Sequence, residues 1–106
     1  MVMARILVVD DEEPVREFVR RALEMDGHRI SIAADGAEAM DVLTDNGGAF
    51  DLLLTDIKMP LMDGIALALA AARDFPALKI MLMTGFADQR ERARNLDALV
   101  RDVLVK

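Results

Sequence analysis

Four short apolar runs, each followed by a polar residue able to do chemistry, constrain the fold of this chain more than any other feature. They are residues 6–9 before Asp10 and Asp11, 52–55 before Asp56, 80–83 before Thr84, and 103–105 before Lys106. Runs of this length, bounded by polar residues, Gly or Pro, are typical of buried strands in a parallel sheet. The carboxyl ends of such strands meet at one edge, where open α/β sheets bind their ligands.

Helix patterns alternate with these runs, and a further short strand is expected before the second helix. The predicted strands are residues 5–9, 29–33, 52–55, 80–83 and 103–105, and the predicted helices are residues 14–26, 36–43, 65–73 and 88–96. Such alternation predicts βαβ units. The element count favours a flavodoxin-like, doubly wound α/β fold, with a parallel five-stranded sheet in the order 2-1-3-4-5. The helix over 88–96 is polar nearly all round, so we expect it to be the most weakly held element.

Composition removes several classes of function. With 106 residues the chain is one domain, and its net charge of −6 argues against nucleic-acid binding, which needs a basic face. The absence of Cys excludes disulfides, thiolate metal sites and Cys nucleophiles. No apolar run approaches the roughly 20 residues of a membrane span, and the N-terminus does not have the pattern of a signal peptide. We therefore expect a cytoplasmic protein with neither nucleic-acid nor membrane partners.

Three carboxylates are expected to meet where strands 1 and 3 end side by side. They belong to Asp10, Asp11 and Asp56, and they would repel one another unless a cation lay among them. Oxygen ligands suit Mg²⁺, which completes its coordination shell with water and phosphate oxygens. Alone, the first two acids would simply be a helix cap. The hydroxyl of Thr84 and the long side chain of Lys106 are expected at the same edge, where they suit a phosphoryl group. This set indicates that Asp56 is a nucleophile that forms an aspartyl phosphate.

The chain also resembles, over its whole length, the response-regulator receiver domains of two-component signalling. The matching motifs are ILVVDDE at 6–12, LTDIKMPLMDG at 54–64, MTG at 83–85 and VLVK at 103–106. The resemblance implies that Asp56 accepts a phosphoryl group from a histidine kinase or a histidine phosphotransfer protein, and that a downstream protein partner responds. It implies Mg²⁺ ligands at Asp10 (through water), Asp11, Asp56 and the backbone carbonyl of Lys58, with Thr84 and Lys106 as the phosphoryl-binding switch pair. The side chain of Lys58 either guards the phosphoryl group from water or is a solvated loop lysine.

Two features narrow or limit the resemblance. The segment 84–87 and the short stretch around Asp97 resemble the stand-alone CpdR-type receivers, which act as adaptors for regulated proteolysis. Val103 stands where many receivers have Tyr or Phe, and the chain ends at Lys106, where the family continues into a fifth helix. We therefore expect residues 1–106 to be a C-terminally truncated receiver domain without the fifth helix or an output domain. Such a form should be a homodimer through its uncovered sheet face, or be less stable than a longer chain.

Two other function classes compete with this interpretation. An aspartate-nucleophile phosphatase also uses Asp, Thr and Lys around Mg²⁺, but its nucleophile ends strand 1, with an acid two residues later. A nucleotide-binding Rossmann-like domain needs glycines after strand 1, where this chain has acids at 10–13. Incubation with acetyl phosphate separates the classes, because a receiver gains one labile phosphoryl group whereas a phosphatase turns over.

Two smaller expectations concern single elements. His28 follows Gly27 at a helix end, so we expect a solvated or dipole-paired turn residue rather than a phosphodonor. The wholly apolar stretch 65–72 should face the sheet with one side. The other side, including Leu69, is either a partner surface or a tolerated exposure.

Overall fold

The fold is given by a computed structural model, which describes residues 4–57, 59 and 62–83 of the 106-residue chain. Strands and helices alternate along these residues, as predicted. The elements are β1 Arg5–Val9, α1 Glu13–Met25, β2 Arg29–Ala33, α2 Gly36–Asp45, β3 Leu52–Asp56, α3 Gly64–Asp74 and β4 Lys79–Met83. Their bounds agree with the predicted ones to within two residues at each end. The predicted helix over 88–96 and strand over 103–105 lie outside the described residues.

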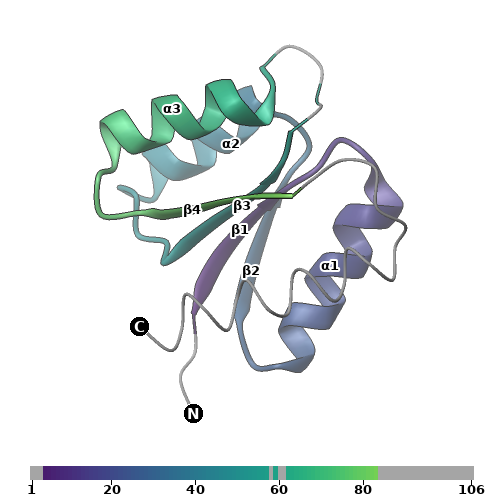
Figure 1. Cartoon of the computed structure of the whole chain (residues 1–106). Helices are drawn as coiled ribbons and strands as arrows, with labels where there is room; N and C mark the ends of the chain where they lie inside the picture. The colour runs from purple at the N-terminus through teal and green to yellow at the C-terminus, as the bar shows by residue number, and fades with distance from the viewer. Residues whose placement is uncertain (1–3, 58, 60–61, 84–106) are drawn as a thin grey trace.

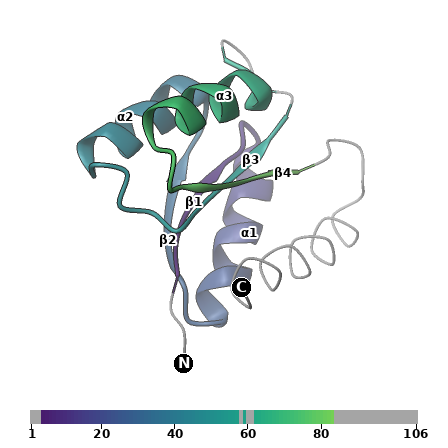
Figure 2. The same cartoon turned by 60° about the vertical axis from the view of Figure 1, so that its left-hand side comes forward.

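The strands form a parallel sheet in the order β2-β1-β3-β4. This order confirms the predicted flavodoxin-like, doubly wound arrangement in the described part of the chain. Helix α1 covers one face of the sheet, and α2 and α3 lie side by side on the other (Figure 1). Figure 2 shows the same division from a second direction. Both faces of β1 and β3 are therefore buried, which explains why their sequences are continuous apolar runs.

The two sheet faces have separate cores. On the α1 side, even-numbered residues of β1 and β3 pack against the apolar stripe of the helix: Ile6, Val8, Leu52, Leu54, Val15, Val19 and Leu23. On the α2 and α3 side, odd-numbered residues of β1 and β3 pack against both helices: Leu7, Val9, Leu53, Ala39, Leu43, Leu67 and Ala71. The division follows the strand period of two, because successive side chains point to opposite faces.

Local sequence signals account for the helix ends. Asp35 caps α2 by accepting a hydrogen bond from the Glu38 N–H at 2.8 Å, and Asp63 caps α3 through the Ala66 N–H at 2.8 Å. Gly27 follows α1 with a φ of +92°, in the left-handed region that glycine tolerates best. The cap of α3 lies in the connection that follows β3.

His28 is buried rather than solvated, so the sequence expectation was wrong. Its exposed fraction is 8%, and its Nδ1 atom accepts a hydrogen bond from the Ala4 N–H at 3.3 Å. The reason is the pairing of β2 with β1: the Arg29 N–H donates to the Ala4 carbonyl at 2.9 Å, so the residue before Arg29 is brought beside Ala4. The local pattern of a helix-ending glycine gave no sign of this contact.

Two exposed apolar side chains, Phe18 and Leu69, show which positions helix periodicity does and does not place correctly in the core. Phe18 follows the spacing of the apolar stripe of α1 but is 43% exposed, because Val15, Val19 and Leu23 face the sheet and Phe18 lies on the flank. Leu69 is 69% exposed on α3, as expected for the side turned away from the sheet. In the part of the chain that the structure describes, no helix is long and apolar enough to cross a membrane.

Candidate metal centre

The carboxyl ends of β1 and β3 bring the predicted acids together. These strands are neighbours, and Val9 is the register partner of Thr55. Asp10, which follows β1, and Asp56, the last residue of β3, therefore lie at the same edge of the sheet. Oxygen atoms from Asp10, Asp11 and Asp56 all lie within 4.8 Å of one another. This is the convergence that the sequence predicted for these three carboxylates.

The three acids differ in exposure. Asp10 is fully buried and Asp56 is 5% exposed, whereas Asp11 is exposed to solvent. Clustered carboxylates repel one another, and burial strengthens the repulsion because less water screens the charges. A divalent cation that accepts oxygen ligands would offset this cost. The three oxygens fit Mg²⁺ in chemistry, and the exposed side at Asp11 leaves a route for the ion and its waters.

Asp10 is held by hydrogen bonds on several sides. Its N–H donates to the carbonyl of Ala33 on β2 at 3.2 Å. Its Oδ1 atom accepts from the Glu12 N–H at 2.9 Å, and its own carbonyl accepts from Nη1 of Arg16 at 2.8 Å. The turn that carries Asp10 and Asp11 is thus anchored to the neighbouring strand and to α1.

Asp56 is held by its own backbone surroundings. Its Oδ1 atom accepts from the Ile57 N–H at 2.9 Å, and its carbonyl accepts from the Thr55 hydroxyl at 2.9 Å. Gly64, the first residue of α3, donates its N–H to the Ile57 carbonyl at 2.8 Å. A Cβ atom on Gly64 would lie 2.0 Å from the Asp56 carbonyl oxygen, so only glycine fits this position.

Three of the predicted site residues, Lys58, Thr84 and Lys106, lie outside the described residues. Strand β4 ends at Met83, which is the register partner of Asp56, and Thr84 is the next residue of the sequence. The roles of these three residues remain predictions.

Sequence reasoning overlooked Arg16 and the close approach of Gly64. No periodic signal shows that an arginine on the first turns of a helix turns back to the carbonyl of Asp10. The Asp63-Gly64 pair is typical of a loop and a helix start, but nothing in the local sequence indicates the contact of Gly64 with Asp56. Both contacts join residues several positions apart, and only the folded backbone brings them together.

A family model for the response regulator receiver domain matches residues 6–106. This chain belongs to that family. Its receiver fold and its acidic edge agree with the match, and a receiver domain is a signalling domain rather than a conventional enzyme. The resemblance stated from the sequence motifs is thereby confirmed.

The match to this chain covers different shares of its curated relatives. Response regulator receiver protein CpdR of Brucella abortus (strain 2308) is 47% identical over 85 residues, which are 80% of this chain and 69% of that protein. Response regulator MprA of Mycobacterium sp. (strain KMS) is 37% identical over 102 residues, which are 96% of this chain and 44% of that protein. This receiver domain therefore spans less than half the length of MprA.

Solved structures agree on the fold. Response regulator protein TrrA of Thermotoga maritima, solved in complex with Mg(2+)-BeF, has a TM-score of 0.80 and 29% sequence identity to this chain. The match covers 95% of this chain and 99% of TrrA.

Proposed function

We propose that this receiver domain is a phosphoacceptor, and that Asp56 takes the phosphoryl group from a phosphohistidine of a histidine kinase or a histidine phosphotransfer protein. The observation that carries the proposal is the cluster of Asp10, Asp11 and Asp56 at the carboxyl edge of β1 and β3, with oxygens within 4.8 Å. The existence of TrrA with Mg(2+)-BeF bound supports a divalent cation in this fold.

The proposed step is a displacement at phosphorus. An oxygen of the Asp56 carboxylate forms a bond to phosphorus while the bond from phosphorus to the donor histidine nitrogen breaks, and its electron pair stays on that nitrogen. When bound, Mg²⁺ would supply positive charge beside the carboxylates and the phosphoryl oxygens. Asp11 and Asp56 would hold the ion directly, Asp10 through water, and Lys58 through its backbone carbonyl. No base is needed, since a carboxylate is ionised near pH 7.

The remaining site residues take roles from the family resemblance. We assign Thr84 and Lys106 to the transferred phosphoryl group, where a hydroxyl and an ammonium would bind its oxygens. Phosphorylation would then switch binding to a downstream protein. The resemblance of segment 84–87 to the CpdR-type receivers suggests a stand-alone adaptor for regulated proteolysis as that output, and a relative named response regulator receiver protein CpdR is 47% identical to this chain.

Phosphorylation assays test the assignment of Asp56. Wild type, Asp56→Ala, Asp56→Asn and Asp41→Ala are incubated with Mg²⁺ and either acetyl phosphate or a phosphohistidine donor. Asp41 is exposed on α2 and serves as the matched carboxylate control. Wild type and Asp41→Ala should gain one phosphoryl group per chain by intact-mass measurement, and both Asp56 variants should gain none. Labelling of an Asp56 variant would refute the proposal, and continuous turnover of acetyl phosphate would favour the phosphatase class.

A further inference from the structure

We propose that Arg16 is a positioning residue for the metal centre, acting through the backbone of the turn between β1 and α1. The inference rests on the proposed function, because it takes the acidic cluster to bind Mg²⁺. Its starting point is the hydrogen bond from Nη1 of Arg16 to the carbonyl oxygen of Asp10 at 2.8 Å. Arg16 is partly buried, so this charged donor is only partly solvated.

The bonded carbonyl belongs to the peptide unit that joins Asp10 to Asp11. A peptide unit is planar, so the orientation of the carbonyl of Asp10 also sets the orientation of the N–H of Asp11. Arg16 therefore controls the backbone rotation that aims the Asp11 side chain. Asp11 is exposed, so the position of its side chain depends on this backbone more than that of a buried residue would.

The rest of the turn is anchored by hydrogen bonds that do not involve the Arg16 side chain. The N–H of Asp10 donates to Ala33 at 3.2 Å, and its Oδ1 atom accepts from the Glu12 N–H at 2.9 Å. The Arg16 backbone N–H in turn donates to the Glu12 carbonyl at 3.0 Å, which begins the α1 ladder. Removing the guanidinium should therefore loosen the peptide between Asp10 and Asp11 without unfolding the turn.

The hydrogen bond of Arg16 is expected to strengthen Mg²⁺ binding by positioning Asp11, whereas its positive charge is expected to weaken it. A cation near the cluster repels Mg²⁺, so removal of the charge alone would tighten binding. Salt screens this repulsion only in part, because Arg16 is partly buried. A site whose ligands are already aimed avoids the ordering cost of binding, and we infer that this gain outweighs the repulsion. Loss of positioning predicts weaker Mg²⁺ binding when the guanidinium is removed, whereas loss of repulsion predicts tighter binding. Measurement of the Mg²⁺ affinity therefore distinguishes the two effects.

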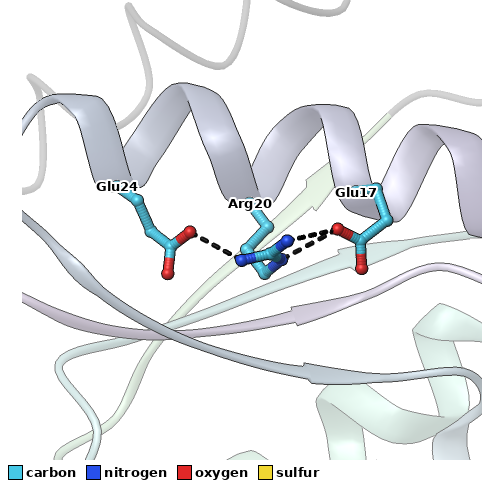
Figure 3. Close-up of polar contacts among 3 residues, drawn as sticks. All are labelled: Glu17, Arg20 and Glu24. Carbon is cyan, nitrogen blue, oxygen red and sulfur yellow. Dashed lines mark hydrogen bonds and ion pairs between the residues drawn. The ribbon is translucent and has the colours of Figure 1, made fainter.

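Arg20 is the matched control on the same helix. It lies one turn further along α1 and has 30% side-chain exposure. Its Nε atom donates to Glu17 at 3.0 Å and its Nη1 atom to Glu24 at 2.7 Å (Figure 3). Replacing it removes the same charge while leaving the bond from Arg16 to Asp10 in place.

The experiment is a calorimetric titration of Mg²⁺ into the full chain at 0.15 M salt, for Arg16→Met, Arg16→Lys, Arg20→Met, Asp11→Asn and wild type. Arg16→Met should weaken binding about five- to tenfold. Arg16→Lys, which keeps a charged donor, should recover to within about threefold of wild type, and Arg20→Met should stay within about twofold. Backbone amide NMR without metal should show the signals of Asp11 and Glu12 shifted or broadened in Arg16→Met only.

The outcomes separate the two proposals. If wild type binds Mg²⁺ and Asp11→Asn does not, but Arg16→Met binds as tightly as wild type or more tightly, the positioning role is overturned alone. A lower metal-free melting temperature with an unchanged dissociation constant would mean that Arg16 is merely structural, which also overturns it. If wild type does not bind Mg²⁺, or Asp11→Asn binds it equally well, both the metal centre and the role of Arg16 are overturned.

Discussion

At the scale of single residues, the site contains a close backbone contact that leaves no space for a larger side chain. Gly64 is the clearest case, because its Cα approaches the main chain of Asp56 rather than a side chain that can move away. In most helices, replacing glycine by alanine adds stability through propensity. Here the added methyl group meets a backbone carbonyl, so the clash decides the sign.

We predict that Gly64→Ala lowers the free energy of unfolding by about 1–3 kcal/mol, the usual cost of overpacking, and slows phosphorylation of Asp56 at least tenfold. Gly47→Ala is the control. Gly47 has a φ of +61° and nothing within 4 Å of an added Cβ, so its substitution should cost stability through backbone strain alone. Urea unfolding and phosphorylation rates check both variants. Equal phosphorylation rates in Gly64→Ala and wild type would show that the contact does not position Asp56.

His28 gives a residue-scale prediction about stability. His28→Ala removes the acceptor for the buried Ala4 N–H, and such a loss costs about 1–3 kcal/mol. His28→Asn keeps a side-chain acceptor and should recover part of that loss, as measured by urea unfolding. Because Ala4 precedes β1 and the acidic cluster follows it, Mg²⁺ affinity should not change in either variant. A fully stable His28→Ala would mean that water replaces the imidazole at no cost.

At the scale of elements, α1 combines a buried apolar stripe with a row of charges. Arg20 lies between Glu17 and Glu24 at the spacings where helix side chains meet (Figure 3). The hydrogen bond from Arg20 lowers the pKa of Glu17 below its ordinary value of 4.5. Exposed pairs of this kind contribute little to stability.

The row of charges predicts a specific pH dependence. A carboxyl whose folded pKa is depressed contributes stability above its unfolded pKa, and the contribution is lost as pH falls through the folded pKa. Arg20→Gln should therefore be slightly less stable than wild type at pH 7, and the difference should shrink as pH falls below 4.5. Urea midpoints at pH 7 and in mild acid test this. A difference that grows on acidification would contradict it.

At the scale of the whole molecule, binding of Mg²⁺ at the acidic cluster would make the stability of the fold depend on the ion. Anything that binds only the folded state stabilises it, by about 2.7 kcal/mol at a ligand concentration of 100 times the dissociation constant. We predict this gain for Mg²⁺ on wild type. Asp11→Asn should lose most of the gain, and should be at least as stable as wild type without metal, because one repelling charge is gone. Thermal unfolding with Mg²⁺ or with a chelator measures both effects, and an unchanged Mg²⁺ gain in Asp11→Asn would refute the assignment.

Self-association through the sheet face that carries α1 stays a prediction at this scale. Light scattering over a range of chain concentrations tests it. A monomer at every concentration would contradict it.

The sequence by itself determined the order and type of the described elements. Short apolar runs between helix stripes permit few arrangements, because both faces of a parallel sheet must be covered. The same runs placed Asp10, Asp11 and Asp56 at one edge, since strand ends converge whatever the side chains nearby. Asp35 and Asp63 accept hydrogen bonds from backbone N–H groups in the first turns of α2 and α3, so these caps depend on local sequence alone.

Only the tertiary structure decided the contacts between segments. The bond from Arg16 to the Asp10 carbonyl, the approach of Gly64 to Asp56 and the burial of His28 beside Ala4 all depend on distances across turns and strands. Local patterns report which face of an element is apolar, but not which backbone atom a neighbouring segment presents to it. Phe18 shows the same limit, since it follows the spacing of the apolar stripe of α1 while the packing of α1 on the sheet leaves it 43% exposed.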